Sequence, residues 1–250
     1  MVSRHSFKGL LAFAMLAVAG CFSSGPSATD DINRGNAKRD AGDLDGAVAV
    51  YNQVLEADPK NALAILNRAM AEVKRDLRDV AMADYNQAIS LDGSNSLAFY
   101  RRAVLKDLQG DFDGAIADYT KALSLTPADG ESADNIRFQL ALTLSRLHRD
   151  LAPAGLVEAV AKEPPEGWSK NVGRFLIGEM TEEALLYAAA AGDEKTVPLR
   201  QCEAYFYAGM VRLLKGDSPG ARDLFGKCVN TGIKSYAEYD LARAEMTRLP

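Results

Sequence analysis

The stretch that decides the fold is residues 110–119, GDFDGAIADY, because its key positions return along the chain at a fixed interval. Ala115 and Tyr119 of this stretch have counterparts 34 and 68 residues earlier. These counterparts are Ala81 with Tyr85, and Ala47 with Tyr51. A period of this size is typical of two-helix units that stack side by side. The sequence therefore predicts an all-α fold built from repeated helix pairs.

Within each unit, the residue types suit two antiparallel helices joined by a tight turn. Gly110 and Asp111 are typical turn residues. Ala115 is small enough for the two helices to approach closely, and Tyr119 lies one turn further along the same helix face. Pro127 ends the unit because a helix interior does not tolerate proline. This pattern predicts three regular units, over residues 28–61, 62–95 and 96–129.

These residues resemble the tetratricopeptide repeat (TPR), whose helix pairs form a superhelical solenoid. The positions that carry the repeat signature are Ala47, Tyr51, Ala81, Tyr85, Ala115, Tyr119, Gly209 and Ala221. The departures within the regular units are mild. Gly93 stands where the second unit would close with proline, and Asp76 stands in place of its turn glycine.

Beyond residue 129 the pattern weakens and then returns. Residues 130–201 predict degenerate TPR-like helices, with a fourth unit at 135–168 and two short helices at 169–201. Residues 202–250 predict a further unit at 202–235 followed by a closing helix. Polar outer positions of that helix are expected at Glu238, Asp240, Arg243 and Glu245. The expected solenoid has about six units, two of them degenerate, and a C-terminal capping helix.

The first 20 residues predict an export signal, because two basic side chains precede an apolar run at residues 10–19. That run is too short to span a bilayer well as a helix. Residues 18–21, VAGC, resemble the lipobox of bacterial lipoproteins, which implies acylation of Cys21 and cleavage just before it. The alternative is an ordinary secretory signal that ends beside a cysteine. In the lipoprotein interpretation, residues 21–29 are the lipidated N-terminus and a flexible tether.

Composition and charge argue against several classes of function. The 250-residue chain has a formal net charge of -5 and no basic block, so nucleic acid is not an expected partner. After removal of the signal only His148 remains among the histidines, and no nucleophile has a suitable spacing to it. No metal spacing and no phosphate-binding loop is evident in the sequence. We therefore expect no enzyme activity, metal or cofactor.

The two remaining cysteines, Cys202 and Cys228, lie in the last predicted unit. Cys202 is expected at the start of its first helix and Cys228 late in its second, so antiparallel packing would bring them together. In an oxidising compartment such a pair can form a disulfide. Two buried free thiols are the alternative.

The TPR resemblance implies a concave groove lined by the first helix of each unit. In this register the groove positions are Ile32, Asn36, Arg39, Leu63, Leu66, Asn67, Met70, Leu97, Tyr100, Arg101 and Val104. Asn36, Asn67 and Arg101 match positions at which some TPR domains hold a peptide carboxy terminus. Ile32 and Leu97 replace the two lysines of that clamp, so the sequence leaves carboxylate capture open, and leaves open that the groove binds no ligand.

The second half resembles the carboxy-terminal half of NlpI-type lipoproteins, which are TPR lipoproteins of the bacterial outer membrane. The resemblance rests on residues 166–168, 175–178, 203–209, 214–217 and 236–239. It implies an adaptor that brings envelope proteases or peptidoglycan hydrolases together. Phe22 after the lipobox cysteine favours the outer membrane, facing the periplasm. The alternative is a structural subunit of an outer-membrane assembly or of a pilus or secretion machine. Exposed end helices are compatible with a homodimer.

Overall fold

The computed structural model describes residues 27–128, 130–162 and 167–249. The predicted signal, Cys21 and most of the tether lie outside the described residues. The described helices are α1 (Ala28–Asp40), α2 (Leu44–Ala57), α3 (Ala62–Lys74), α4 (Arg78–Leu91), α5 (Ser96–Gln109), α6 (Phe112–Leu125), α7 (Glu131–Arg146), α8 (Leu156–Lys162), α9 (Trp168–Leu176), α10 (Glu182–Ala189), α11 (Thr196–Leu214), α12 (Ser218–Asn230) and α13 (Ala237–Arg248). Over these ranges there is no strand. None of these helices combines the length and the apolar character that crossing a bilayer requires.

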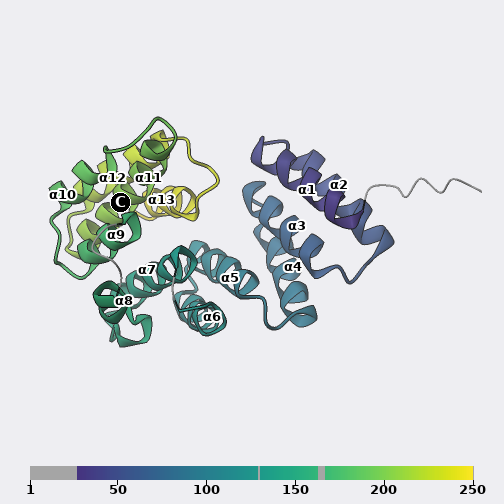
Figure 1. Ribbon diagram of the computed structural model, residues 1–250, viewed down its shortest axis with the longest axis horizontal. Coiled ribbons are helices and arrows are strands. Elements are labelled where there is room, and N and C mark those ends of the chain that lie inside the picture. Colours follow the sequence, from purple (N-terminus) through teal and green to yellow (C-terminus); the bar gives the residue numbers. More distant parts are fainter. Residues whose placement is uncertain (1–26, 129, 163–166, 250) are drawn as a thin grey trace, which may run out of the picture.

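Helices α1 to α6 stack as three antiparallel pairs, and the chain then curves back on itself (Figure 1). Helices α3 and α5 lie on the inner side of the arc, while α4 and α6 lie on its outer side. The C-terminal helices α11 to α13 come round to face this inner side. The predicted all-α fold of paired helices is confirmed over the described residues.

The turns between paired helices explain why the glycine-aspartate sequence recurs. Gly42 and Gly110 have φ angles of 85° and 84°, a left-handed conformation that glycine adopts without steric cost. The aspartate that follows each glycine caps the next helix, as Asp111 does by accepting from the Gly114 amide at 3.0 Å. Asp76 takes the same left-handed conformation, with φ 61°, in the turn that lacks a glycine.

The signature alanines and aromatics form the contacts between the two helices of each unit. The signature alanines are fully buried, and the tyrosines Tyr51, Tyr85 and Tyr119 are at most 2% exposed. Gly35 faces Tyr51 so closely that a Cβ added there would lie 2.4 Å from the ring. Gly209 stands against Phe225 in the same way, at 2.7 Å. The small residue is therefore required because a large ring fills the space opposite it.

An arginine network that the repeat signature does not contain links successive units. Arg68 of α3 donates two hydrogen bonds to Asp84 of α4, at 2.7 and 2.8 Å, and a third to Asn52 of α2 at 2.8 Å. The same three bonds recur 34 residues later, from Arg102 to Asp118 and to Asn86. Bidentate arginine–carboxylate pairs are among the stronger hydrogen-bonded contacts in proteins. These pairs join the two helices of one unit, and the third bond, to the asparagine, ties that unit to the one before it.

The middle of the chain is less regular than a repeat unit. Helix α7 begins at Glu131 rather than near residue 135, and its expected partner is reduced to a 3-10 turn (Ala152–Ala154) and the short helix α8. Helices α9 and α10 follow as two short helices. Helix α11 begins at Thr196, so the expectation that Cys202 starts it is wrong. The residues of its additional first turns, 196–201, are half-buried.

The closing helix α13 is only partly the polar cap that the sequence predicts, because Arg243 is exposed and Asp240 is half-buried but the two glutamates are not at the surface. Glu238 and Glu245, expected on its outer surface, are only 4% and 2% exposed. Glu245 forms an ion pair with Arg146 of α7 at 2.9 Å, and Glu238 accepts from Gln139 of α7 at 2.9 Å. These carboxylates are buried because α13 packs inside the arc, against α11, α12 and α5, rather than covering its end.

Candidate functional site

The two ends of the solenoid meet and enclose a cleft. Lys74 at the end of α3 donates to the carbonyl of Lys234, a residue 160 positions later in the segment before α13. Arg248 of α13 donates to the carbonyl of Asp107 of α5. The space between these walls comprises two adjoining cavities of about 250 and 740 Å³. The inner helices α1, α3 and α5 form one wall, and residues 232–243 form the other.

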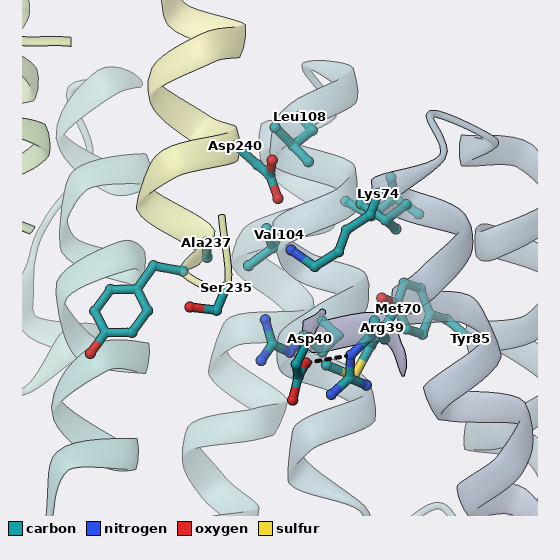
Figure 2. A pocket seen from close by; sticks show the side chains of 14 residues that line it. Arg39, Asp40, Met70, Lys74, Tyr85, Val104, Leu108, Ser235, Ala237 and Asp240 are labelled. Atoms are coloured by element: carbon teal, nitrogen blue, oxygen red, sulfur yellow. Dashed lines mark hydrogen bonds and ion pairs between the residues drawn. The ribbon is translucent and has the colours of Figure 1, made fainter. Parts of the chain in front are cut away.

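Helices α3 and α5 give the cleft an apolar floor. This floor consists of Met70, Val73, Val104, Leu105 and Leu108. Polar and charged groups surround it, from Arg39 and Asp40 at the end of α1 to Ser235 and Asp240 on the C-terminal wall (Figure 2). An apolar surface with a few convergent polar groups is the usual character of a binding site.

Of the sequence-predicted groove positions, Arg39, Met70, Arg101 and Val104 line this cleft. Leu63 and Leu97 are exposed side chains, at 49% and 43%, at the beginnings of α3 and α5. Ile32 and Leu66 are only 4% and 1% exposed because they pack in the core between units. The expectation that these two residues line the groove is therefore corrected.

The two asparagines of the predicted clamp are joined by an arginine. Arg39 donates to the side-chain oxygens of Asn36 and Asn67 at 3.2 and 3.0 Å, and to Asp40 at 3.1 Å. Asn36 also accepts from the Tyr51 hydroxyl at 2.8 Å. Both amide oxygens are thus occupied. The side-chain nitrogen of Asn67 already donates to the Leu63 carbonyl at 2.8 Å. What the two amide groups can still offer to a ligand is their remaining N–H donors, which suit the carbonyl or carboxylate oxygens of a peptide.

Tyr100 and Arg101 lie side by side near the junction of the two walls. The Tyr100 ring packs against Tyr119 with a centroid distance of 5.9 Å, and burial raises the pKa of its hydroxyl. The Arg101 guanidinium lies 5.7 Å from the Tyr100 ring centroid, and its Nε is buried without a hydrogen-bond acceptor among the described residues. A buried donor without a partner is costly and marks a place where a ligand acceptor would be favoured.

Burial and neighbouring charges shift the pKa values of two groups in the cleft, Lys74 and Asp240. Burial lowers the pKa of Lys74, and the nearby Asp240 opposes that shift. Burial likewise raises the pKa of Asp240, against the effect of Lys74 and Arg243. The sequence did not single out Lys74 or Ser235 for this site. No local pattern could have done so, because the two walls come from opposite ends of the chain.

A second group of polar side chains is buried between α7, α9, α11 and α13. Glu203 of α11 accepts from the indole of Trp168, and Glu238 accepts from Tyr207 at 3.0 Å and from Gln139. Burial, together with the charge of Glu238, raises the pKa of Glu203 to about 8. We interpret these groups as part of the internal packing. No group of metal-ligating side chains occurs among the described residues.

The cysteine pair of the last unit lies deep in the same region. The sulfurs of Cys202 and Cys228 are 3.4 Å apart, and both side chains are fully buried. A disulfide bond is about 2.05 Å long, so this is a contact between two thiols. The two helices bring the sulfurs together as expected, and the disulfide stays a prediction.

If the protein matures in an oxidising compartment, we expect Cys202 and Cys228 to be joined. Closing a loop of about 25 residues stabilises a fold by roughly 3 kcal/mol in the chain-entropy model. Chemical unfolding with and without reductant measures this difference, and thiol alkylation under denaturing conditions counts the free sulfurs. In Cys202→Ala the reductant should have no effect. Two alkylated thiols in the exported protein would contradict the prediction.

Comparisons with known proteins agree with the repeat register. Family models of the TPR repeat and the tetratricopeptide repeat match residues 35–73 and 66–130. A tetratricopeptide repeat protein from Parabacteroides merdae has a similar structure, with a TM-score of 0.54 at 19% identity over 90% of this chain and 86% of that chain.

Two smaller structures match about half of the chain. The first TPR of Spaghetti (RPAP3), bound to an HSP90 peptide, is 29% identical over 47% of this chain and 93% of that one, with a TM-score of 0.42. The second TPR domain of human RPAP3, in complex with an HSP70 peptide, is 33% identical over 49% and 96%, with a TM-score of 0.41. Together, the 34-residue register, the helix pairs and the family matches establish that residues 35–130 are tetratricopeptide repeats within an all-helical solenoid.

Proposed function

We propose that this protein is a lipid-anchored adaptor of the bacterial envelope that binds segments of partner proteins in the cleft between its two ends. The observation that carries the binding function is the cleft itself. It has an apolar floor from two successive repeats, polar and charged groups around that floor, and room for several side chains. Stacked repeats commonly use such concave surfaces to bind other proteins.

The groups around the cleft suit an extended peptide. Arg39 holds the side-chain amides of Asn36 and Asn67 in fixed positions, and the Leu63 carbonyl holds the Asn67 nitrogen as well. Ordering these side chains before binding lowers the entropy that association costs. The exposed Leu63 and Leu97 offer apolar contacts at the beginnings of the same helices. The peptide ligands of the RPAP3 domains support a function of this kind.

The proposed cellular location and the proposed class of partner are both based on the sequence. The lipobox-like residues 18–21 support acylation of Cys21 and attachment to a membrane facing the periplasm. The likeness of the second half to NlpI-type lipoproteins supports proteases or peptidoglycan hydrolases as partners. The alternative is a structural role in an outer-membrane or secretion complex. The test must distinguish this role from the adaptor function.

A pull-down from cross-linked cells tests the function. We expect the native chain to recover soluble envelope proteases or peptidoglycan hydrolases, and Arg101→Ala and Asn67→Ala to recover about tenfold less, which corresponds to about 1.4 kcal/mol. Lys121→Ala is the control, because Lys121 is exposed on the outer helix α6. Recovery of barrel or secretin complexes alone would contradict the adaptor. Cys21→Ser should move the protein from the membrane to the soluble fraction.

A further inference from the structure

The cleft carries a charge opposite to that of the whole chain. Five cations line it, Arg39, Lys74, Arg101, Lys234 and Arg243, against the two acids Asp40 and Asp240. The difference is 5 - 2 = +3, on a chain whose formal net charge is -5. A local excess of one sign between low-dielectric walls attracts ligands of the other sign.

Two cations of this excess, Lys74 and Arg101, lie on the inner helices α3 and α5. Arg39 is already paired with Asp40 at 3.1 Å. Neither Arg101 nor Lys74 has a carboxylate within ion-pair distance among the residues that the structure describes. By contrast, Arg68 and Arg102 on the same inner helices are each held by a buried aspartate. The uncompensated cations are therefore the ones that face the cleft.

Both cations are partly withdrawn from water. The Arg101 Nε is buried and has no acceptor. The Lys74 ammonium points across the cleft toward the wall that carries Ser235 and Asp240, and its one hydrogen-bond acceptor is the Lys234 carbonyl (Figure 2). Removing a cation from water is unfavourable unless an anion compensates it. A carboxylate entering the cleft would supply that compensation to both side chains.

From this we infer that the cleft binds a partner segment with consecutive acidic side chains, inserted between the α1–α3–α5 wall and residues 232–243. This inference rests on the proposed peptide-binding function and adds the chemistry of the ligand. The occupant contacts both ends of the solenoid, with Arg101 and Lys74 on one wall and Arg243 on the other. It also competes with the Lys234 carbonyl for the Lys74 ammonium.

The test uses the full chain and a labelled peptide of four glutamates with both ends blocked, followed by fluorescence anisotropy. We expect binding that weakens as salt rises from about 50 to 300 mM, because partly exposed charges are screened. Lys74→Gln, Arg101→Gln and Arg243→Gln should each weaken it about tenfold. Lys121→Gln, on the outer surface, should leave it unchanged. The same peptide with four glutamines should not bind.

Several results would overturn the inference. One is equal binding of the glutamate and glutamine peptides, and another is binding that survives all three cleft substitutions. A third is a glutamine peptide that binds only when its carboxy terminus is free, because that would place the recognised carboxylate at a chain end. No binding of the glutamate peptide would also refute it. If partner recovery in cells still depended on Arg101 in that case, the adaptor function would stand without the acidic ligand.

Discussion

Tyr119→Ala is expected to lower the free energy of unfolding by about 3–5 kcal/mol, the usual cost of removing a large aromatic side chain from a core. Tyr119 is fully buried between the helices of the third unit and packs on Tyr100. Urea unfolding followed by circular dichroism measures the change. Tyr187→Ala is the matched control, since Tyr187 is 80% exposed and its removal should alter stability by less than about 0.5 kcal/mol.

A smaller change at the same position should act in the opposite direction. The Tyr119 hydroxyl is buried without a hydrogen-bond partner among the described residues. Tyr119→Phe removes an unsatisfied group, so we expect stability to stay equal or to rise by about 1 kcal/mol. Tyr51 occupies the equivalent repeat position but donates to Asn36 at 2.8 Å, so Tyr51→Phe should instead cost about 1 kcal/mol. Equal effects of the two substitutions would contradict this account of the hydroxyls.

The second large effect is on the pH dependence of stability. Burial and the neighbouring Glu238 raise the pKa of Glu203 to about 8 in the folded protein, against 4.5 for an ordinary glutamate. The folded state therefore binds a proton that the unfolded state has lost. Stability from this group is complete below about pH 4.5 and is lost as pH rises through about 8, by on the order of 2–4 kcal/mol.

Glu203→Gln isolates this contribution. Glutamine keeps an oxygen that can accept from the Trp168 indole but carries no charge, so the variant should be the more stable protein at pH 9 and should show a flatter stability curve between pH 5 and 8. Unfolding free energies across this range measure the slope. Glu183→Gln, an exposed glutamate of α10, should keep the slope of the native chain. A native protein whose stability rises from pH 5 to 8 would contradict the assignment.

The first half of the fold could be predicted because its information is local and repeated. Ala115 and Tyr119 recur with a fixed period, and the turns before α2 and α6 each carry a capping aspartate. The arginine network also recurs after 34 residues, at Arg68 and Arg102, but these arginines are not part of the repeat signature. Comparing polar positions at the repeat period would have found it.

The second wall of the cleft could not be predicted in the same way. Whether α13 covers the end of the solenoid or packs inside it depends on the accumulated curvature of all preceding units. The degenerate segment around α8 to α10 contributes to that curvature. Because this segment does not repeat, its effect on the curvature cannot be calculated from the sequence period. The polar residues Glu238 and Glu245 therefore predicted a solvent-facing helix. Their partners Gln139 and Arg146 lie about 100 residues away in sequence, outside the reach of any local pattern.

The contact between Lys74 and the Lys234 carbonyl has a consequence for how this array could grow and unfold. An open solenoid gains or loses a terminal unit with little effect on the rest, because each unit contacts only its neighbours. Here an inserted unit would move the two walls apart and destroy the cleft, so the number of units is constrained by geometry. The same closure joins the first repeats to the last helix, so opening one end exposes the other. We therefore expect this chain to lose its structure as a whole rather than fray from its ends.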